Sequence, residues 1–456
     1  MDLCIGTSDL EHAGQPQCRR QHGVASPSKA VRLATSSSRR PIARSTPRRR
    51  SSRIPSIDTD RPQTDVGRTL HQLRGPAMGA RSFCFGTPDS EKAGKVYVAG
   101  PVTRVLLTGA GGSAAANVHD ALRRSHHDYQ IVGADSSAIR LHLSRADHRF
   151  VIPRADHADY PSAIMALVEH TNVDVVHPQP DPEVLALGSI RSELSAATYL
   201  PSQPSLEMAA DKSAFRAAMA AAGIAVPEGA SFTDLDSAAS ETQRLLQDHS
   251  RVWVRARVGA GARASLPVSS VDQALAWLRW WIQEKSMSAS DFMASEFLPG
   301  REFAYQSVWQ EGRLVAGQVR ERVEYLYGHL TPHGQTSTPS VARTVSNPAV
   351  DELSMSAIRA LDPHPCGAYC VDIKEADDGS PRVTEINAGR FFTTSNFFAA
   401  AGLNMPDLLM RCALGERVEP VGTSPLEADL YWIRMVDMGY ALVRGSELDA
   451  WPRPDS

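Results

Sequence analysis

Two carboxylates and an amide stand close together in the last third of the sequence. Asp372 precedes the short turn ADDGS, and Glu385 and Asn387 follow it. Side chains two apart on a strand share a face, and a short hairpin turn brings the partner strand alongside. Oxygen ligands without histidine, incomplete until a substrate adds its own oxygens, are typical of Mg²⁺ (or Mn²⁺) held with nucleotide phosphates, not of zinc.

The alternative for these residues is a polar edge of an antiparallel sheet. It is disfavoured because Val383, Ile386 and the pair Phe391–Phe392 mark the strand as half buried, where unpaired carboxylates are costly. Arg390 adds a cation beside the ligands. The phenylalanines and the TTSN segment after it indicate the wall of an acceptor pocket, with plain core packing as the alternative for the phenylalanines.

A glycine-rich loop, VGAGARAS, marks a second candidate site. It follows an expected strand that carries Arg255 and Arg257, and it contains Gly259 and Gly261. Glycines free backbone N–H groups to surround an anion, and guanidinium groups supply bidentate donors for phosphate oxygens. A hairpin turn without function is the alternative.

An earlier glycine loop favours a different cofactor. Gly109, Gly111 and Ala114 follow an apolar strand, and Asp135 ends the next strand. This pattern is similar to the dinucleotide fingerprint and would fit an NAD(P)-binding oxidoreductase. The alternative is a tight turn between strand and helix, and the residues suited to catalysis lie far downstream.

The elements around these loops predict a mixed α/β and α+β chain. Strands alternate with helices over 101–204, which predicts a parallel, doubly wound sheet. An alanine-rich helix is expected within 205–223, an amphipathic helix over 271–285, and antiparallel strands from 292 onward that turn at Glu311-Gly312. Glu296 and Glu302 flank a Pro-Gly turn, either as site residues or as solvated carboxylates. No internal repeat is seen.

Charge separates the first hundred residues from the rest. Residues 1–100 carry 17 Lys and Arg against 8 Asp and Glu, whereas the remainder carries 31 against 43. The Arg/Ser/Pro-rich arm is predicted to be disordered. It could bind nucleic acid or another polyanion, act as a transit peptide, or be a solvated extension before a later start such as Met78. Asp2, Asp9 and Glu11 oppose the transit peptide.

The chain is predicted to be soluble and cytoplasmic. Among its 456 residues there is no apolar run of about 18 residues that could span a bilayer, and no signal-peptide segment follows the start. The six cysteines are scattered without a CxxC pair, which favours reduced thiols.

The order of these motifs resembles the ATP-grasp superfamily. The resemblance rests on the Asp-Lys that opens a helix in ADKSAFRAAMAAAGIAVP, the basic strand before the glycine loop, EFLPGRE, and the D…EIN…R hairpin, and it covers about residues 102–420. The chain is most similar to short relatives of the carbamoyl-phosphate synthase large subunit and to carboxylate-amine ligases. The implied domains are a basic extension (1–100), a Rossmann-like pre-ATP-grasp domain (101–204), an ATP-grasp domain (205–420) with a glycine-loop subdomain at about 228–298, and a C-terminal tail (421–456).

The resemblance also implies roles for individual residues. Lys212, Arg255, Arg257, Gly259 and Gly261 would bind the ATP phosphates, Glu296, Phe297 and Leu298 the adenine, and Glu302 the ribose. Asp372, Glu385 and Asn387 would bind magnesium, Arg390 would steady the transferring phosphoryl group, and His333 would lie on a loop that approaches the phosphates. Two departures are a lysine more usual at Arg255 and one extra residue before Arg390 in EINAGR.

The implied reaction joins a small-molecule carboxylate to an amine through an acyl phosphate. Phosphorylation of bicarbonate or carbamate is the alternative, although the chain has one such module and no amidotransferase signature. A non-catalytic nucleotide-binding protein is a further alternative. Arg320, Arg322 and His329 could bind the acceptor carboxylate or form a solvated basic strand. A homodimer is allowed, and neither a membrane nor a nucleic-acid partner is expected.

Overall fold

The computed structural model describes residues 102–259, 264–336, 338–436 and 439–447. The expectations for the basic arm, including its three alternative roles, and for Gly261 therefore lie outside the described residues. Three short 3₁₀ helices accompany the main elements, at Ala289–Asp291, Gly328–Leu330 and Gly445–Glu447. No helix in the described ranges has the length and apolar character needed to cross a membrane.

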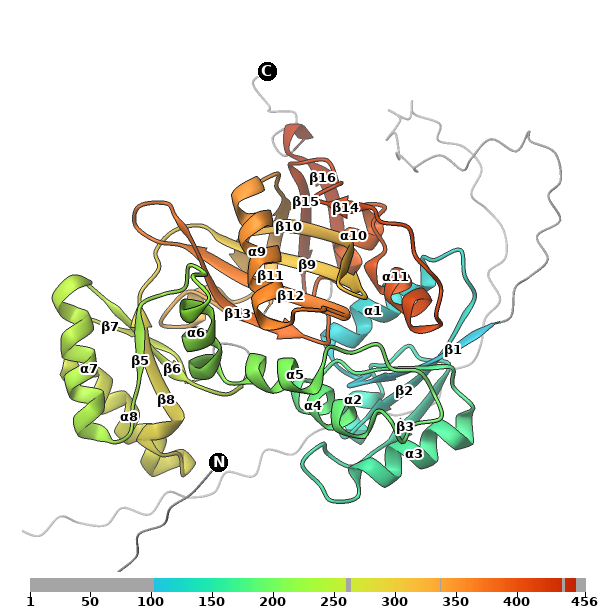
Figure 1. Ribbon diagram of the computed structural model, residues 1–456, viewed down its shortest axis with the longest axis horizontal. Coiled ribbons are helices and arrows are strands. Elements are labelled where there is room, and N and C mark those ends of the chain that lie inside the picture. The colour runs from blue at the N-terminus through green and yellow to red at the C-terminus, as the bar shows by residue number, and fades with distance from the viewer. Residues whose placement is uncertain (1–101, 260–263, 337, 437–438, 448–456) are drawn as a thin grey trace, which may run out of the picture. The chain divides into compact units, whose positions relative to one another are not determined.

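The first unit is a parallel sheet with strand order β3-β2-β1-β4 (Figure 1). Its strands are β1 (Thr103–Thr108), β2 (Tyr129–Asp135), β3 (His148–Val151) and β4 (Val175–His177). Its helices are α1 (Ser113–Arg123), α2 (Ala138–Leu141), α3 (Tyr160–Thr171) and α4 (Asp181–Ile190). In the central strand, Val105 is paired with Ile131 on one side and with Val175 on the other. Such apolar runs are typical of strands that helices cover on both faces.

The alanine-rich segment forms two helices instead of the single helix expected. These are α5 (Gln203–Ala210) and α6 (Lys212–Ala221), and Asp211 between them has extended backbone angles. The Asp211 carboxylate accepts hydrogen bonds from the main-chain N–H groups of Ser213 and Ala214, so it caps α6. The break places Lys212 at the first position of the second helix.

A small sheet follows, with strand order β5-β8-β6-β7. Its strands are β5 (Gly229–Ser231), β6 (Val252–Ala256), β7 (Leu266–Val268) and β8 (Phe292–Glu296), and its helices are α7 (Leu235–Asp248) and α8 (Val271–Lys285). The helices pack on the sheet around a separate apolar core that includes Leu245, Val254 and Leu278 (Figure 1). The two strands that bracket the glycine loop, β6 and β7, are paired antiparallel.

The large sheet has the order β13-β12-β9-β10-β11-β15-β16, and β14 pairs with β10. Its strands are β9 (Glu302–Gln310), β10 (Arg313–Tyr325), β11 (Pro339–Thr344), β12 (Gly367–Glu375), β13 (Pro381–Ala388), β14 (Gly422–Thr423), β15 (Leu430–Met435) and β16 (Gly439–Arg444). Helix α9 (Pro348–Leu361) packs within one apolar core, and α10 (Ser395–Ala400) and α11 (Met405–Ala413) pack within another. The expected tail after residue 420 therefore differs from the structure, because strands β14 to β16 extend this sheet.

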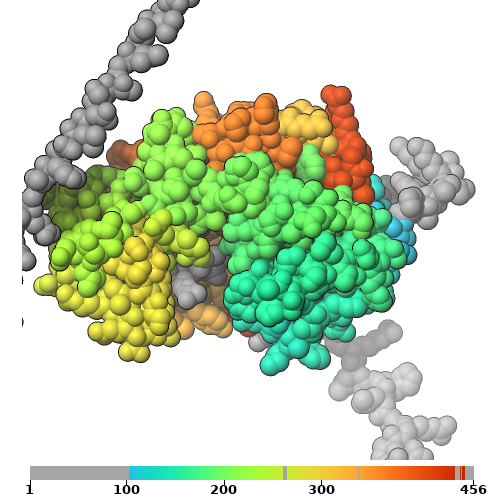
Figure 2. Space-filling model, turned by 60° about the horizontal axis from the view of Figure 1, so that its bottom comes forward, coloured from blue at the N-terminus to red at the C-terminus, as the bar shows by residue number. Residues whose placement is uncertain are grey.

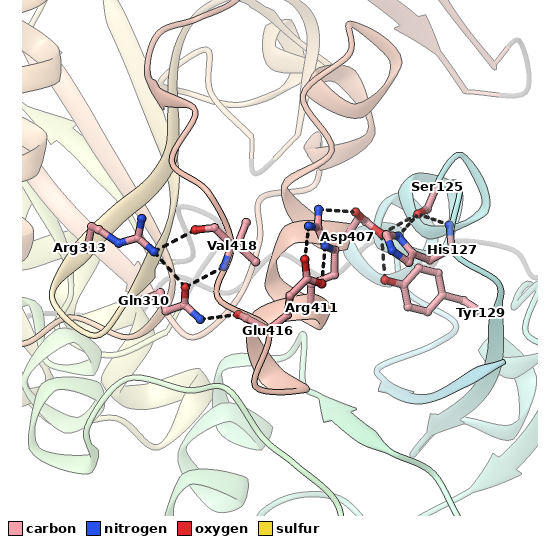
Figure 3. Close-up of polar contacts among 9 residues, drawn as sticks. All are labelled: Ser125, His127, Tyr129, Gln310, Arg313, Asp407, Arg411, Glu416 and Val418. Atoms are coloured by element: carbon pink, nitrogen blue, oxygen red, sulfur yellow. Dashed lines mark hydrogen bonds and ion pairs between the residues drawn. The ribbon is translucent and has the colours of Figure 1, made fainter. Parts of the chain in front are cut away.

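A carboxylate on α11 joins the large sheet to the parallel-sheet unit (Figure 3). Asp407 Oδ1 accepts hydrogen bonds from Ser125 Oγ at 2.5 Å and Tyr129 Oη at 2.9 Å, and it lies 3.2 Å from His127 Nδ1. Burial and the Asp407 charge raise the pKa of Tyr129, so the phenol stays a hydrogen-bond donor at neutral pH. This contact joins the parallel-sheet unit to α11, which packs in the same apolar core as residues of the large sheet.

Candidate functional site

A cavity of about 370 Å³ is lined by residues of the small sheet, of the large sheet and of the segment that follows β4 in the parallel-sheet unit. Figure 2 shows the surface hollowed between the parallel-sheet unit, in teal, and the small sheet and its helices, in yellow. Most sequence-predicted site residues line the cavity: Lys212, Arg255, Gly259, Glu296, Phe297, Leu298, Glu302, Asp372, Glu385, Asn387 and Arg390. The volume lies in the range of small-molecule sites.

An acid pair lies in the wall of this cavity. Asp372 on β12 and Glu385 on β13 are direct partners across the hairpin, and Asn387 Nδ2 donates to Asp372 Oδ2 at 3.1 Å. Burial raises the pKa of Asp372, and the Glu385 and Glu302 carboxylates add to that rise against the opposing charge of Arg322. Two carboxylates held together in this way favour a cation between them.

Two cations from other elements approach Glu385. Lys212 Nζ lies 3.4 Å from Glu385 Oε2, and Arg255 Nη1 lies 3.8 Å from the same oxygen. Burial opposes ionisation, but these two cations lower the pKa of Glu385, so the carboxylate is ionised at neutral pH. Lys212 Nζ also donates to the Gly259 carbonyl at 2.5 Å. The lysine thus connects the acid pair to the glycine loop.

Arg390 reaches the same point despite the extra residue before it. Gly389 has φ +84° and donates its N–H to the Ala368 carbonyl at 2.8 Å, which turns the chain sharply after β13. Arg390 Nη2 then donates to Asn387 Oδ1 at 2.5 Å and to Asp181 Oδ2 of α4 at 3.1 Å. The insertion is absorbed by a glycine turn, and the guanidinium remains in the cavity wall.

The opposite end of the cavity is more apolar. Trp253, Phe297 and Leu298 line it, and the Trp253 and Phe297 ring centroids are 6.2 Å apart. Glu296 beside them lies 3.6 Å from His249 Nε2 and 3.9 Å from Arg382 Nε. A flat heterocycle fits this end, because aromatic and aliphatic groups surround it with a polar group at its edge.

Glu302 lies in the cavity wall with both oxygens already in use. It accepts hydrogen bonds from Arg322 Nη1 at 2.6 Å, from Gln335 Nε2 at 2.9 Å and from the Tyr325 hydroxyl. Burial opposes ionisation, but Arg322 and Lys374 lower the pKa of Glu302. A ribose hydroxyl would have to replace one of these donors.

Comparisons with known proteins agree with this arrangement. Residues 105–199 match the family model described as PylC-like, N-terminal domain. The biotin carboxylase domain of Hydrogenobacter thermophilus 2-oxoglutarate carboxylase, solved as a dimer with MgADP, ADP and bicarbonate, superposes with TM-score 0.57 at 15% identity over 73% of this chain and 74% of that one.

Two further solved structures are similar. An L-amino acid ligase from Bacillus licheniformis has TM-score 0.53 at 15% identity, over 72% of this chain and 78% of that one. Carboxyaminoimidazole ribonucleotide synthase from Aspergillus clavatus, with ATP, has TM-score 0.53 at 17% identity, over 73% and 81%. No curated protein matched the sequence.

The chain has the ATP-grasp fold. The resemblance seen in the sequence and the mixed α/β and α+β fold class are both confirmed. The parallel sheet takes the place of the pre-ATP-grasp domain, and residues 105–199 carry the family match within it.

Two predicted ATP-grasp residues lie outside the cavity lining. Arg257 forms an ion pair with the Asp211 cap, Nη2 to Oδ2 at 2.5 Å, and donates to the Ser290 carbonyl. The His333 ring packs against Trp253, with centroids 5.1 Å apart, and burial lowers its pKa. Arg257 therefore positions the start of α6, and from the His333 loop Gln335 and Thr336 line the cavity.

The first glycine loop does not support the dinucleotide interpretation. Asp135 Oδ2 accepts the Gly111 N–H at 2.9 Å, and a Cβ added at Gly109 would lie 2.6 Å from Pro180 Cγ. These contacts within the protein account for the glycines without a ligand. The loop, together with Ala114 at the start of α1, serves as a turn between strand and helix.

Sequence reasoning missed several cavity residues. Gln179 and Asp181 enter from the parallel-sheet unit, at the end of β4 and the start of α4, and Lys374 enters from β12. The only sequence signal for the first two was a strand that stops at prolines in VVHPQPDPEV. Of the three residues suggested for an acceptor carboxylate, Arg320 and Arg322 line the cavity, whereas His329 is exposed elsewhere.

The acid pair fits Mg²⁺ that shares its ligands with phosphates. No group of three or more His, Cys, Asp and Glu side chains among the described residues has the arrangement of a protein-only metal site. Two carboxylates and one amide are what Mg²⁺ needs when phosphates and water complete its shell. Burial, to which the Glu385 and Glu302 charges add, raises the pKa of Asp372, and a bound cation would stabilise the ionised carboxylate against both.

Proposed function

We propose that this chain is an ATP-dependent, ADP-forming ligase that converts a substrate carboxylate into an acyl phosphate and joins it to an amine. One observation carries the proposal. Lys212 and Arg255 lie beside Glu385, and Arg390 pairs with the neighbouring Asn387, at one end of a cavity whose other end is apolar. That combination suits a nucleotide with its phosphates directed at the acid pair.

Each end of the cavity supplies a different part of nucleotide binding. The adenine would lie against Trp253, Phe297 and Leu298, beside Glu296. The ribose would approach Glu302. The phosphates would lie between Lys212 and Arg255, where Gly259 at φ +108° leaves the main chain free of a side chain.

Asp372, Glu385 and Asn387 would hold magnesium, which neutralises phosphate charge and orients the transferring group when it is bound. Asn387 Oδ1 accepts from Arg390 in this structure, so the amide would have to release that hydrogen bond to serve as a ligand. Manganese meets the same requirement for oxygen ligands.

The proposed reaction has two displacement steps. A carboxylate oxygen attacks the γ-phosphorus and ADP leaves, giving an acyl phosphate. The amine nitrogen then attacks the acyl carbon, inorganic phosphate leaves, and the nitrogen loses a proton. The protein contributes charge and position: Arg390, fixed by Asp181 and Asn387, lies where it can stabilise the transferring phosphoryl group.

Phosphorylation of bicarbonate is the second candidate. It is supported by the similar biotin carboxylase domain, whose structure contains MgADP and bicarbonate. The two candidates differ in what ADP release requires, because bicarbonate alone would suffice for the second and an organic acid is needed for the first.

A screen for ADP release tests the proposal. The full chain is incubated with MgATP and pairs of carboxylates and amines, with bicarbonate alone as a separate arm. Ligase activity predicts ADP release that needs one acid and an amide product that needs one amine. Binding of ATP without ADP release in any arm would contradict the proposal in favour of a non-catalytic nucleotide-binding protein.

A control variant separates chemistry from folding. Glu321 lies between Arg320 and Arg322 on β10, outside the cavity lining, and accepts from Arg343 Nη2 at 2.7 Å. Glu321→Gln should keep turnover, and Glu385→Gln should lose it.

We also propose that the chain can form a homodimer, as the similar carboxylase domain does. Light scattering of the purified chain would test this.

A further inference from the structure

Arg320 is a buried guanidinium whose hydrogen bonds are incomplete. The residue is 1% exposed, and its Nε and Nη1 atoms have no hydrogen-bond partner among the described residues. Arg322, two positions along β10, instead pairs with Glu302 and Asp372. A buried unpaired charge is costly, so proteins rarely keep one without a use. Arg320 lines the cavity, so a molecule bound there would lie next to this guanidinium.

Strand register places Arg320 two strands away from Asp372. Asp372 on β12 is paired with Ala304 on β9, and Ala304 is paired with Arg320 on β10. Neighbouring strands are about 4.8 Å apart, so the Arg320 and Asp372 backbones are separated by roughly 10 Å. Phe392 packs on Ala304 between them and the Arg322 guanidinium reaches across to Asp372, and Arg320 lies beside these groups in the cavity wall.

The cavity wall next to Arg320 is apolar. The Phe392 ring lies beneath Arg320, with the guanidinium carbon 5.1 Å from the ring centroid, and Phe392 packs with Ala304 and Cys370. Burial lowers the pKa of Arg320 to about 9, and the Arg322 charge contributes, opposed by Asp372. An anion bound at Arg320 would pair with the guanidinium, and a short carbon chain attached to that anion would cover the Phe392 ring.

We propose that the non-nucleotide substrate is a small acid with two carboxylates. One of them is phosphorylated, and Arg320 binds the other. This inference rests on the proposed ligase function. The reacting carboxylate must lie beside Arg390, Lys212 and Arg255, where the γ-phosphate would be held. Arg320 lies across Ala304 from that point, at a separation that a short dicarboxylic or amino-dicarboxylic acid can span.

The test compares acids that differ only in the second carboxylate. ADP release is measured with MgATP and short dicarboxylic and amino-dicarboxylic acids, each beside its monoamide and monomethyl ester. The variants are Arg320→Met, which removes the charge and keeps the length, and Arg320→Lys, which keeps the charge and loses the bidentate fork. Arg343→Met, an arginine of β11 paired with Glu321 outside the main cavity, is the matched control.

Wild type should prefer the free diacid to its monoamide by on the order of 100-fold in kcat/KM, because an ion-paired bidentate contact is lost. In Arg320→Met that preference should disappear through a higher KM, with the KM for ATP unchanged. Arg320→Lys should keep part of the preference for the diacid, and Arg343→Met should keep all of it. A merely structural role would lower turnover of every acid equally.

Two failures can be distinguished. If wild type releases no ADP with any acid, the ligase function is wrong and this inference fails with it. If wild type releases ADP but treats diacids and monoamides alike, or if Arg320→Met keeps the preference, only the role of Arg320 is overturned. Melting temperatures of all variants are measured first, and should Arg320→Met fail to fold, the reduced preference of Arg320→Lys decides.

Discussion

Two glycine-rich loops in this chain each follow a strand and lie near a pair of carboxylates. They differ in what surrounds their glycines. The loop after β1 lies near Asp135 and Glu183, and the protein itself occupies its open side: Asp135 accepts the Gly111 N–H, and Pro180 abuts Gly109. Its glycines are needed because other parts of the chain lie where side chains would be.

The loop after β6 adjoins Asp372 and Glu385 through Lys212. A Cβ added at Gly259 would meet no atom of the described residues within 4 Å. Cations surround its acid pair, and a cavity adjoins it. The difference teaches that glycine content alone does not separate a loop whose glycines are required by packing from one whose glycines face open space.

The largest expected effect separates the two acid pairs. Glu385→Gln removes the charge that Lys212 and Arg255 face, so ADP release should fall by at least about 10³-fold. Asp135→Asn should change kcat by less than about twofold, because Asp135 serves only the turn. Steady-state ADP release is measured for both, with circular dichroism to confirm folding. Equal losses in the two variants would break the comparison.

A second expected effect concerns pH. Burial raises the pKa of Glu183 to about 7, and the nearby Asp135 carboxylate adds to the rise. A raised pKa favours folding at low pH, and that contribution is lost as pH rises through 7. Glu183→Gln should therefore be more stable than wild type by about 3 kcal/mol at pH 9 but not at pH 5. Urea unfolding at both values measures this, and a constant difference would contradict it.

A third effect tests the filled loop directly. A Cβ at Gly111 would overlap the main chain of Arg140, which cannot move as a side-chain tip can. Gly111→Ala should lower the free energy of unfolding by about 2 kcal/mol, the usual cost of overpacking. Its kcat, measured well below the melting temperature, should stay near that of wild type. An unchanged melting temperature would show that the loop has room.

The smallest expected effect tests the open loop. Gly259→Ala adds no clash within the described residues, and only the positive φ of +108° opposes it. The stability cost should be about 1 kcal/mol, with a raised KM for ATP as the main functional change. A raised KM for ATP in Gly259→Ala together with an unchanged KM in Gly111→Ala would support the difference between the two loops. The reverse result would indicate that the first loop binds the nucleotide.

Sequence reasoning succeeded where local pattern decides structure. The apolar strands VLLTG and IVGAD predicted the parallel sheet, and ADDGS predicted the hairpin that pairs Asp372 with Glu385. It failed where distant contacts decide. The break at Asp211 is a different, local case: periodicity alone predicted one helix within 205–223, whereas the Asp-Lys of the ATP-grasp resemblance correctly marked a helix start at Lys212.

Other misses have similar physical causes. The pairing of Arg390 with Asp181 joins positions 209 residues apart, which no local pattern encodes. The burial of Arg320 depends on Phe392 and on neighbouring strands, so an arginine in QVRERVEYL was equally compatible with a solvated strand. By contrast, the alternation in LYWIRM could have predicted β15 in the supposed tail.

The contact between Asp181 and Arg390 has a consequence for dissecting this protein. A fragment that began at residue 205 would keep Lys212, Arg255 and the acid pair. It would nevertheless leave Arg390 without the carboxylate that orients it, and Asp407 without its hydroxyl donors Ser125 and Tyr129. The half of the chain that carries the acid pair is therefore not a self-sufficient module, and chimeras that exchange only one half would have to carry these contacts across the junction.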